Sequence, residues 1–365
     1  MQNKIKDKII VFGFCLILIV VFVINIFTKD QKISITERRK LEQFPKITLS
    51  KLLSGDISDK FEKYAIDQFI GRDFFRSLKA YFNINILQYK DNNKLYIKDE
   101  GIYKIEYPLN EKNVRKSAEK INEINQTYLQ GMDTYYAIIP DKNYYLADDK
   151  YLKIDYEKLK NIMKDSITEV KYIDIWEDLT LEDYYRTDTH WKQENLDNVV
   201  NKIQQEMGLE IGDIANKYDI KEKGDFYGVY YGQLGLDIAP DKISILTNDM
   251  IHNCTTYNFE TKKNGKIYDE EKFAKSADKY DIYLSGATYL MTIENPNAKT
   301  EKELLLFRDS YGSSIAPLLI ENYSKITLID TRYISSKLLS DYIEFKDQDV
   351  LFLYSTLVLN QNILK

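Results

Sequence analysis

A short apolar run that ends at a turn of small and charged residues constrains the fold more than any other stretch of the chain. Leu304–Phe307 has the length and composition of a buried strand. The residues after the turn recur with the period of a helix, at Ile315, Leu318, Leu319 and Asn322. A strand that passes directly into a helix is typical of an open α/β sheet, which binds ligands at the carboxyl ends of its strands. The turn contains Ser310 and therefore marks a candidate site.

Ser310 has the surroundings of a nucleophile. It would lie near the positive end of a helix dipole, where free amide groups could hold an oxyanion. Gly312, Ser313 and Ser314 are small enough to let a substrate approach the backbone. The alternative is that Asp309, Ser310 or Ser313 only caps the helix, and on this stretch alone the cap is favoured.

Strand-like and helical segments alternate along the rest of the chain, which predicts an α/β domain with a doubly wound, mostly parallel sheet. The expected strands are Thr134–Ile139, Val170–Ile175, Leu304–Phe307, Lys325–Ile329 and Val350–Tyr354. Residues 208–283 are poorer in apolar periodicity and predict an inserted lobe or hairpin over the sheet's edge. Neither GxGxxG nor GxxxxGK[ST] occurs in that segment, so it carries no nucleotide-binding fingerprint.

The N-terminal segment Ile9–Phe27 is apolar apart from Asn25. At a rise of ~1.5 Å per residue it is long enough to cross a bilayer core of ~30 Å. It exceeds the ~7–15 apolar residues of a signal peptide and no Ala-x-Ala-like site follows, so an uncleaved transmembrane anchor is predicted. Lys4, Lys6 and Lys8 favour a cytoplasmic N-terminus, although several basic residues after the anchor weaken the asymmetry.

These features divide the chain of 365 residues into four parts. They are a cytoplasmic N-terminus (1–8), a transmembrane anchor (9–27), a membrane-proximal collar and hairpin (28–105) and an α/β domain (106–365). The collar should contain an amphipathic helix from about Ser58 to Phe69, and the hairpin should span Lys94–Lys104.

Composition excludes some functions. Charged residues make up 30% of the chain with both signs mixed and a net charge of -6, so no broad nucleic-acid binding is expected. Of the two cysteines, Cys15 lies inside the anchor, so an intrachain disulfide is not expected. His252 and Cys254 lack a second pair of ligands, and no metal site is predicted.

A second polar segment supplies the partners that Ser310 would need. Asp188 and His190 are two residues apart, so in an extended loop both side chains point the same way. The carboxylate could then accept the Nδ1–H and leave Nε2 facing a substrate. A solvated turn capped by Thr187 or Thr189 is the alternative. Together with Ser310, provided that the segments are adjacent, they would supply nucleophile, base and orienting group.

The two segments resemble those of a known family. TDTHW (Thr187–Trp191) and RDSYGSS (Arg308–Ser314) look like motifs of the DHHW proteins and their relatives, the periplasmic alginate O-acetyltransferases with an SGNH-hydrolase-like domain. In these proteins the Asp-x-His segment precedes the serine segment, as here. Further segments that resemble the family are Glu37–Pro45, Asp67–Phe75, Ile139–Leu146 and Ile329–Tyr333.

The resemblance implies a catalytic domain with a triad of Ser310, His190 and Asp188. It also implies that Arg332 and Tyr311 lie near the acceptor or the acetyl group. Family members often carry an asparagine oxyanion donor in the strand before the serine segment, whereas this chain has LSGATYL (Leu284–Leu290) there. The backbone amides of Ser310 and Gly286 are the replacement donors we expect.

The predicted function is that of a membrane-anchored, externally facing acyltransferase that acetylates hydroxyls of an exported or cell-surface polysaccharide. No cofactor is expected, and the resemblance implies a multi-spanning membrane O-acyltransferase as acetyl supplier. Tyr230 and Tyr231, within the aromatic segment Phe226–Tyr231, are predicted to line the sugar groove. A hairpin whose aromatic residues pack on the domain is the alternative. An acetyl esterase with the same triad, or a non-catalytic polysaccharide-binding or assembly protein, remains open.

Overall fold

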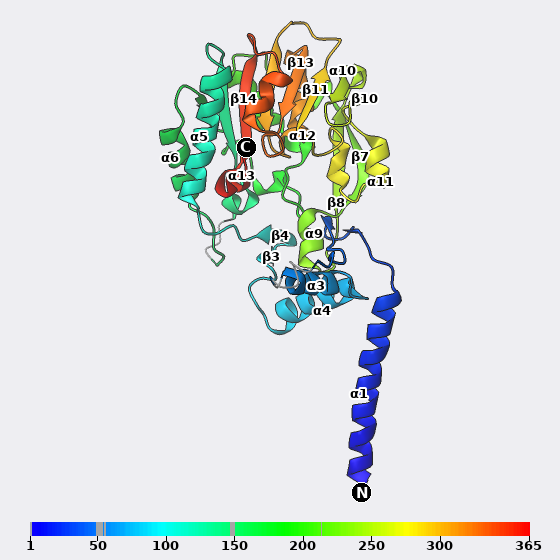
Figure 1. Cartoon of the computed structure of the whole chain (residues 1–365). Helices are drawn as coiled ribbons and strands as arrows, with labels where there is room; N and C mark the ends of the chain where they lie inside the picture. The colour runs from blue at the N-terminus through cyan, green and yellow to red at the C-terminus, as the bar shows by residue number, and fades with distance from the viewer. Residues whose placement is uncertain (1, 49–53, 55, 147–149, 213) are drawn as a thin grey trace. The chain divides into compact units, whose positions relative to one another are not determined.

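The computed structural model describes residues 2–48, 54, 56–146, 150–212 and 214–365 (Figure 1). The chain divides into two compact units, the first comprising Met1–Asn92 with Gly232–Asp237 and the second Asn93–Tyr231 with Ile238–Lys365. The hairpin of β3 (Leu95–Lys98) and β4 (Gly101–Lys104) belongs to the second unit, whereas the sequence analysis had grouped it with the collar.

An eight-stranded sheet forms the centre of the second unit, in the order β10-β9-β11-β13-β12-β14-β5-β6. The five predicted strands are its parallel part: β5 (Thr134–Ile139), β6 (Lys171–Ile173), β12 (Glu303–Arg308), β13 (Lys325–Ile329) and β14 (Asp349–Ser355). The apolar side chains of β12 and β14 are buried on both faces, which is why these strands are continuous apolar runs in the sequence.

Three further strands extend the sheet antiparallel at one edge: β9 (Thr255–Asn258), β10 (Lys263–Gly265) and β11 (Leu290–Glu294). Two of them, β9 and β10, come from the segment expected to be an inserted lobe. The rest of that segment includes a separate antiparallel pair, β7 (Asp219–Phe226) with β8 (Asp241–Thr247), and the short helix α9 (Val229–Leu234) lies between these two strands in the chain. The shorter helices of this region are α8 (Ile214–Lys217), α10 (Asp249–Asn253) and α11 (Glu270–Lys275).

Helices cover the sheet as two groups. In one group, α5 (Glu111–Tyr128) packs against α6 (Tyr156–Ser166) and α13 (Thr356–Gln361). In the other, α12 (Gly312–Leu319) packs against α7 (Asp197–Glu206). The connection from β5 through α6 to β6 and the connection from β12 through α12 to β13 both lead away from β14, but in opposite directions along the sheet. Because such crossovers are right-handed, the two helices lie on opposite faces of the sheet. This is the doubly wound arrangement, and it puts the carboxyl ends of β5, β12 and β14 at one edge of the sheet.

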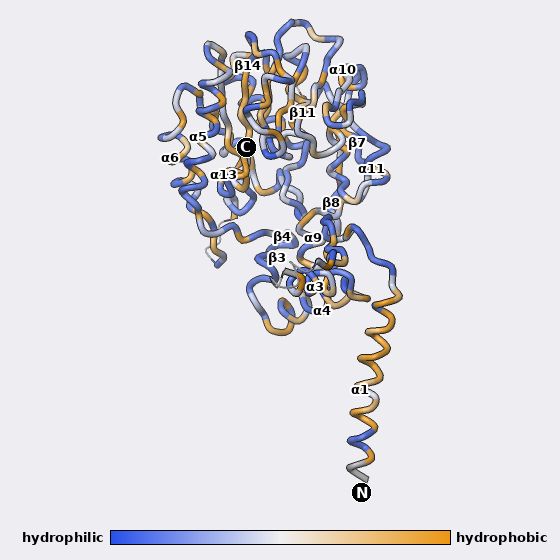
Figure 2. Tube along the Cα trace, in the orientation of Figure 1, coloured by the Kyte–Doolittle hydropathy of each residue, from blue (hydrophilic) through white to orange (hydrophobic). Residues whose placement is uncertain are grey.

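The first unit begins with α1 (Gln2–Phe27), in which Ile5–Phe27 is long and apolar enough to cross a membrane (Figure 2). Its apolar side chains are exposed throughout. Two short strands follow, β1 (Ile33–Ser34) and β2 (Arg39–Lys40), and then the helices α3 (Asp56–Asp67) and α4 (Arg72–Tyr81), which continues as a π-helix over Phe82–Ile86.

Candidate active site

The turn between β12 and α12 presents Ser310 at the carboxyl end of a central strand. The carboxylate of Asp309 holds this turn: Oδ1 accepts the Tyr311 N–H at 3.0 Å and Oδ2 accepts the Ser355 N–H at 2.8 Å. The Ser310 side chain makes no capping bond to α12 among the described residues, and Ser310 remains partly exposed. The predicted cap is therefore not the role of this hydroxyl.

Instead, the Ser310 hydroxyl faces His190. Its Oγ lies 2.7 Å from His190 Nε2, and His190 Nδ1 lies 2.6 Å from Asp188 Oδ1. Asp188 is fully buried and His190 is 9% exposed. Because a buried carboxylate accepts the Nδ1–H, the neutral imidazole keeps its lone pair on Nε2 and can accept the serine proton. The structure thus brings together the three residues that the sequence analysis had singled out from separate segments.

Hydrogen bonds from a distant part of the chain hold the Asp-x-His loop, residues 186–191. Asp241 at the start of β8 accepts the backbone N–H groups of Arg186 and Thr187 at 2.9 and 2.8 Å, and its Oδ2 accepts the Thr187 hydroxyl at 2.6 Å. The Val229 N–H donates to Asp188 Oδ2 at 2.6 Å. The second oxygen of the Asp188 carboxylate is thereby satisfied, which fixes its orientation toward His190.

Gly228 lets this loop pack closely on the segment before α9. A Cβ at this position would lie 2.2 Å from the Thr187 carbonyl oxygen and 2.5 Å from Asp188 Cβ, so only glycine fits. Its N–H donates to Thr187 Oγ1 at 2.9 Å. The aromatic segment Phe226–Tyr231 therefore contributes to the support of the Asp-x-His loop.

Lys142, in the segment that follows β5, is a buried cation beneath the same loop. Its Nζ donates to the Tyr185 and Arg186 carbonyl oxygens at 2.9 and 3.0 Å and lies 5.2 Å from the centre of the Tyr230 ring. Burial lowers the pKa of Lys142 to about 7, although the carboxylates of Asp188 and other aspartates act in the opposite direction. A lysine in this position supports the loop whether charged or neutral.

Tyr280 is a neighbour of His190 that sequence reasoning missed. Its ring stacks on the imidazole with centroids 3.9 Å apart and an interplanar angle of 11°, and its hydroxyl donates to Ser314 Oγ at 2.8 Å. Burial raises the pKa of Tyr280 well above its usual value, so it acts as a neutral hydrogen-bond donor. Tyr280 stands 90 positions from His190 in the chain, in a segment whose pattern gives no signal of this contact.

The two backbone N–H groups predicted to bind an oxyanion, those of Ser310 and Gly286, differ in whether they already donate a hydrogen bond. Among the described residues no acceptor is found for the Ser310 N–H. The Gly286 N–H donates to the Tyr283 carbonyl oxygen at 3.1 Å, and its role at an oxyanion would require that bond to break. Gly286 has a φ of 82°, and a Cβ there would lie 2.1 Å from Asp281 Oδ1, which accounts for a glycine at this position.

Most of the aromatic residues that were predicted to bind the acceptor are buried within the domain. Tyr311 is 2% exposed and its hydroxyl donates to the Thr189 carbonyl oxygen at 2.6 Å, which supports the Asp-x-His loop. Tyr230 is 6% exposed, so its ring has no open face for stacking on a sugar. Tyr231 is partly exposed and packs on Tyr227, which is 45% exposed. Contact with an acceptor stays a prediction, and it is best placed at Tyr227 and Tyr231.

Arg332 follows β13 and is paired with a buried carboxylate. Its Nε and Nη2 donate to the two oxygens of Asp330 at 2.8 and 2.6 Å. Burial lowers the pKa of Arg332, but the bidentate bond to Asp330 and the charges of Asp330 and Asp309 together outweigh it and raise this pKa. With Tyr333 and the C-terminal residues, Arg332 lines a cavity of about 460 Å³, and its place near the acetyl group or acceptor stays a prediction.

Metal-binding groups do not gather in the described part of the chain: no three His, Cys, Asp or Glu side chains are close enough there to hold an ion. His252 Nε2 lies 3.3 Å from the Thr247 hydroxyl, and Cys254 is a buried free thiol.

Solved structures share this fold. PatB1 of Bacillus cereus superposes with a TM-score of 0.61 at 21% sequence identity, covering 75% of this chain and 98% of PatB1. PatB1 with a sulfonyl adduct gives 0.59 at 19% identity, covering 74% and 96%. A DHHW family protein from Eubacterium siraeum gives 0.59 at 19% identity, covering 74% and 93%. No protein-family profile matches the sequence, and no curated protein matches it either.

At these identities the comparison establishes the fold. The chain has the SGNH-hydrolase-like α/β fold of the DHHW family protein and PatB1, and the resemblance seen in the motifs is confirmed at the level of the fold. The arrangement of Ser310, His190 and Asp188 comes from this chain's own geometry.

Proposed function

We propose that this chain is a membrane-anchored O-acetyltransferase that moves acetyl groups onto hydroxyls of an exported or cell-surface polysaccharide. The observation that carries the proposal is the hydrogen-bonded series from Asp188 through His190 to Ser310, with distances of 2.6 and 2.7 Å. The motif resemblance and the shared fold support acyl transfer as the reaction of this triad.

The chemistry divides into two half-reactions. In the first, His190 Nε2 takes the Ser310 proton while Oγ attacks the acetyl carbonyl of the donor, and the proton then passes to the leaving group. In the second, a sugar hydroxyl gives its proton to His190 and attacks the acetyl-serine, and Ser310 regains a proton as the sugar ester is released. Asp188 keeps the imidazole in the required tautomer throughout.

The surroundings of the reaction follow from the proposed anchor. With α1 in the cell membrane and the three leading lysines inside, the second unit lies outside the cell. A multi-spanning membrane O-acyltransferase would supply the acetyl group. A cysteine introduced at the exposed Ser54 should then react with a membrane-impermeant thiol reagent in intact cells. If a well-expressed variant did not react with the reagent, the proposed orientation of α1 would be wrong.

Mass spectrometry of Ser310 tests the triad directly. After exposure to an activated acetyl ester such as p-nitrophenyl acetate, the peptide that contains Ser310 should carry one acetyl group. The modification should be absent from Ser310→Ala and His190→Ala and retained in the control His252→Ala, which changes the other histidine. A sulfonyl fluoride should block the labelling. Absence of acetyl from the wild-type serine would overturn the proposal, and acetyl-serine that yields only acetate in the presence of oligosaccharide would identify an esterase.

A further inference from the structure

The loop that joins α3 to α4 is bonded to the end of α1. The Ile70 N–H donates to the Asn25 side-chain oxygen at 2.8 Å, and the Asn25 side-chain amide donates to the Val21 carbonyl oxygen of its own helix at 3.0 Å. Asn25 is the one strongly polar residue of the apolar segment Ile9–Phe27. Its contacts lie within the first unit and place the connection from α3 to α4 beside the last turn of α1. This connection and the first turn of α4, together residues 68–75, are called the Ile70 loop below.

One side of the Ile70 loop consists of large apolar side chains that the described protein leaves exposed. Phe74 and Phe75 are 65% and 52% exposed, and Phe69 and Ile70 are 37% and 38% exposed. The Phe75 ring contacts the other two, with centroids 5.7 Å apart for Phe69 and Phe75 and 5.4 Å apart for Phe74 and Phe75. They form a contiguous apolar surface, which a soluble protein rarely exposes without a partner.

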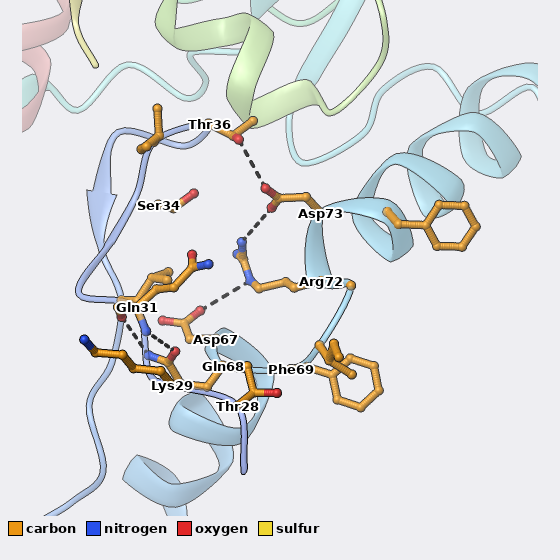
Figure 3. Close-up of a pocket in the computed structure, with 15 residues that line it drawn as sticks. Thr28, Lys29, Gln31, Ser34, Thr36, Asp67, Gln68, Phe69, Arg72 and Asp73 are labelled. Carbon is orange, nitrogen blue, oxygen red and sulfur yellow. Dashed lines mark hydrogen bonds and ion pairs between the residues drawn. The ribbon is translucent and has the colours of Figure 1, made fainter. Parts of the chain in front are cut away.

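The other side of the loop is polar, and its charges are paired. Arg72 forms ion pairs with Glu37, with Asp67 at 3.7 Å and with Asp73 at 3.3 Å, and the Asp67 carboxylate also accepts a bidentate bond from Arg39. Figure 3 shows Asp67, Arg72 and Asp73 among the residues that line a cavity of about 390 Å³, with the Phe69 ring on the side away from Gln31. The ion-paired side chains of Asp67 and Arg72 thus point away from the Phe69 ring, while Phe69, Ile70 and Phe74 also border this cavity.

The bond to Asn25 sets the level of the loop relative to a membrane. Asn25 is two residues before the end of α1, so at a rise of ~1.5 Å per residue it lies about 3 Å inside that end. We propose that the apolar side of the Ile70 loop inserts into the bilayer that α1 crosses, at the boundary between headgroups and acyl chains. Amphipathic segments with such a face bury to a depth of about 5–10 Å at this boundary.

Two features of the structure favour lipid over a protein partner. Ile70 is bonded to Asn25 near the exposed apolar end of α1, whose Ile26 and Phe27 are 61% and 84% exposed. A backbone N–H brought near the hydrocarbon region needs an internal acceptor, and Asn25 supplies one for Ile70. The first unit would then have two membrane contacts, which limits its rotation about α1. This inference rests on the proposed anchoring of α1.

Depth-dependent fluorescence quenching tests it on the full chain in phosphatidylcholine and phosphatidylglycerol vesicles. Cys15 and Cys254 are replaced by alanine, and a bimane label is attached to a cysteine at one of three positions: Phe74, Val20 in α1 or Ile220 in β7. Ile220 is the matched control, because it is 64% exposed and belongs to the other unit. Lipids spin-labelled near the headgroup should quench the Phe74 label at least about threefold more strongly than the Ile220 label.

The other outcomes separate the explanations. If lipids spin-labelled deep in the acyl chains do not quench the Val20 label, the proposal that α1 crosses the membrane is wrong, and the inference about the Ile70 loop is overturned with it. If Val20 is quenched but Phe74 behaves like Ile220, the Ile70 loop lies in water and the inference is overturned. Shielding of Phe74 from aqueous iodide without lipid quenching would indicate a protein partner and would also overturn it. Asn25→Leu, which makes α1 more apolar, should keep the Val20 quenching and reduce that of Phe74.

Discussion

The base and the nucleophile of the proposed triad differ in how much of their support comes from residues that are distant in the sequence. The Asp-x-His loop depends on groups far away in the sequence, from Lys142, the Val229 amide, Asp241 and Tyr280. The turn that carries Ser310 is held in part by its neighbour Asp309, which accepts the Tyr311 N–H, and in part by remote contacts such as the bond from the Ser355 N–H to Asp309. The difference teaches that substitutions far from a substrate can alter the position of the base, whereas the nucleophile also has a local bond, from the Tyr311 N–H to Asp309, that such substitutions leave in place.

Removal of either reacting side chain should have the largest effect. Ser310→Ala and His190→Ala should each lower acetyl transfer by at least about 10⁴-fold, and the double variant should lose little more, because groups that act as a unit are not additive. Steady-state rates with a small acetyl ester measure this. Losses that multiply in the double variant would show that the two residues act independently.

A substitution in the remote support should have the next largest effect. Asp241→Asn removes a charge-assisted acceptor from the Asp-x-His loop, and we expect kcat to fall by about 10²-fold with a loss of roughly 1–3 kcal/mol in unfolding free energy. Asp225→Asn on the adjacent strand is the control, since its carboxylate is exposed and pairs only with Lys242 in the described structure. Equal rates for the two variants would mean that the loop holds its geometry without Asp241.

The aromatic segment before α9 should separate support from acceptor binding. Replacement of the exposed pair, in Tyr227→Ala with Tyr231→Ala, should lower transfer to an oligosaccharide by about tenfold, ~1.4 kcal/mol, and spare hydrolysis of a small ester. Tyr230→Ala removes a buried ring beside Lys142 and should lower both activities together. An unchanged transfer rate in the first variant would move the acceptor groove elsewhere, with the surface around Arg332 next to test.

The last prediction concerns the stability of the protein, not its rate, as a function of pH. The folded pKa of Lys142, about 7, lies below the ordinary lysine value of ~10.4, so between these pH values the unfolded chain binds more protons. The unfolding free energy of the wild type should therefore rise with pH from about 7 to about 10, relative to Lys142→Met. Urea unfolding at several pH values measures the difference. The exposed control Lys221→Met should show no such trend, and a flat difference for Lys142→Met would contradict the assignment.

The sequence predicted the parallel half of the sheet and missed its antiparallel edge, and for the outermost strand, β10, the reason is physical; β11 is buried at four of its five positions and was missed all the same. Strands buried on both faces, such as β12 and β14, must be apolar throughout and are therefore visible as runs. The edge strand β10 has the sequence Lys263-Asn264-Gly265 and is fully exposed, so nothing in its composition distinguishes it from a loop. The lobe was accordingly expected to be more separate from the sheet than it is.

The candidate site also contains some residues that a local sequence pattern reveals and others that it does not. The Asp188 and His190 pair could be found because a spacing of two in an extended loop fixes their relation locally, and Ser310 because a strand-to-helix turn is a local pattern. Tyr280 and Asp241 could not, because their contacts arise from the packing of segments that are distant in the chain. Tyr230 is 6% exposed, which agrees with the alternative that the aromatic residues of this segment pack on the domain, and no local pattern could decide between the two.

The bond between Asp309 and the Ser355 N–H gives the protein a natural spectroscopic reporter. The Ser355 amide is buried at the end of β14 and donates to the carboxylate next to the nucleophile. Its exchange with solvent deuterium requires that bond to open, so its exchange rate measures how often the serine turn leaves its working geometry. The exchange rate of this single amide could therefore report how often the turn that carries Ser310 opens in the intact chain, without a substrate.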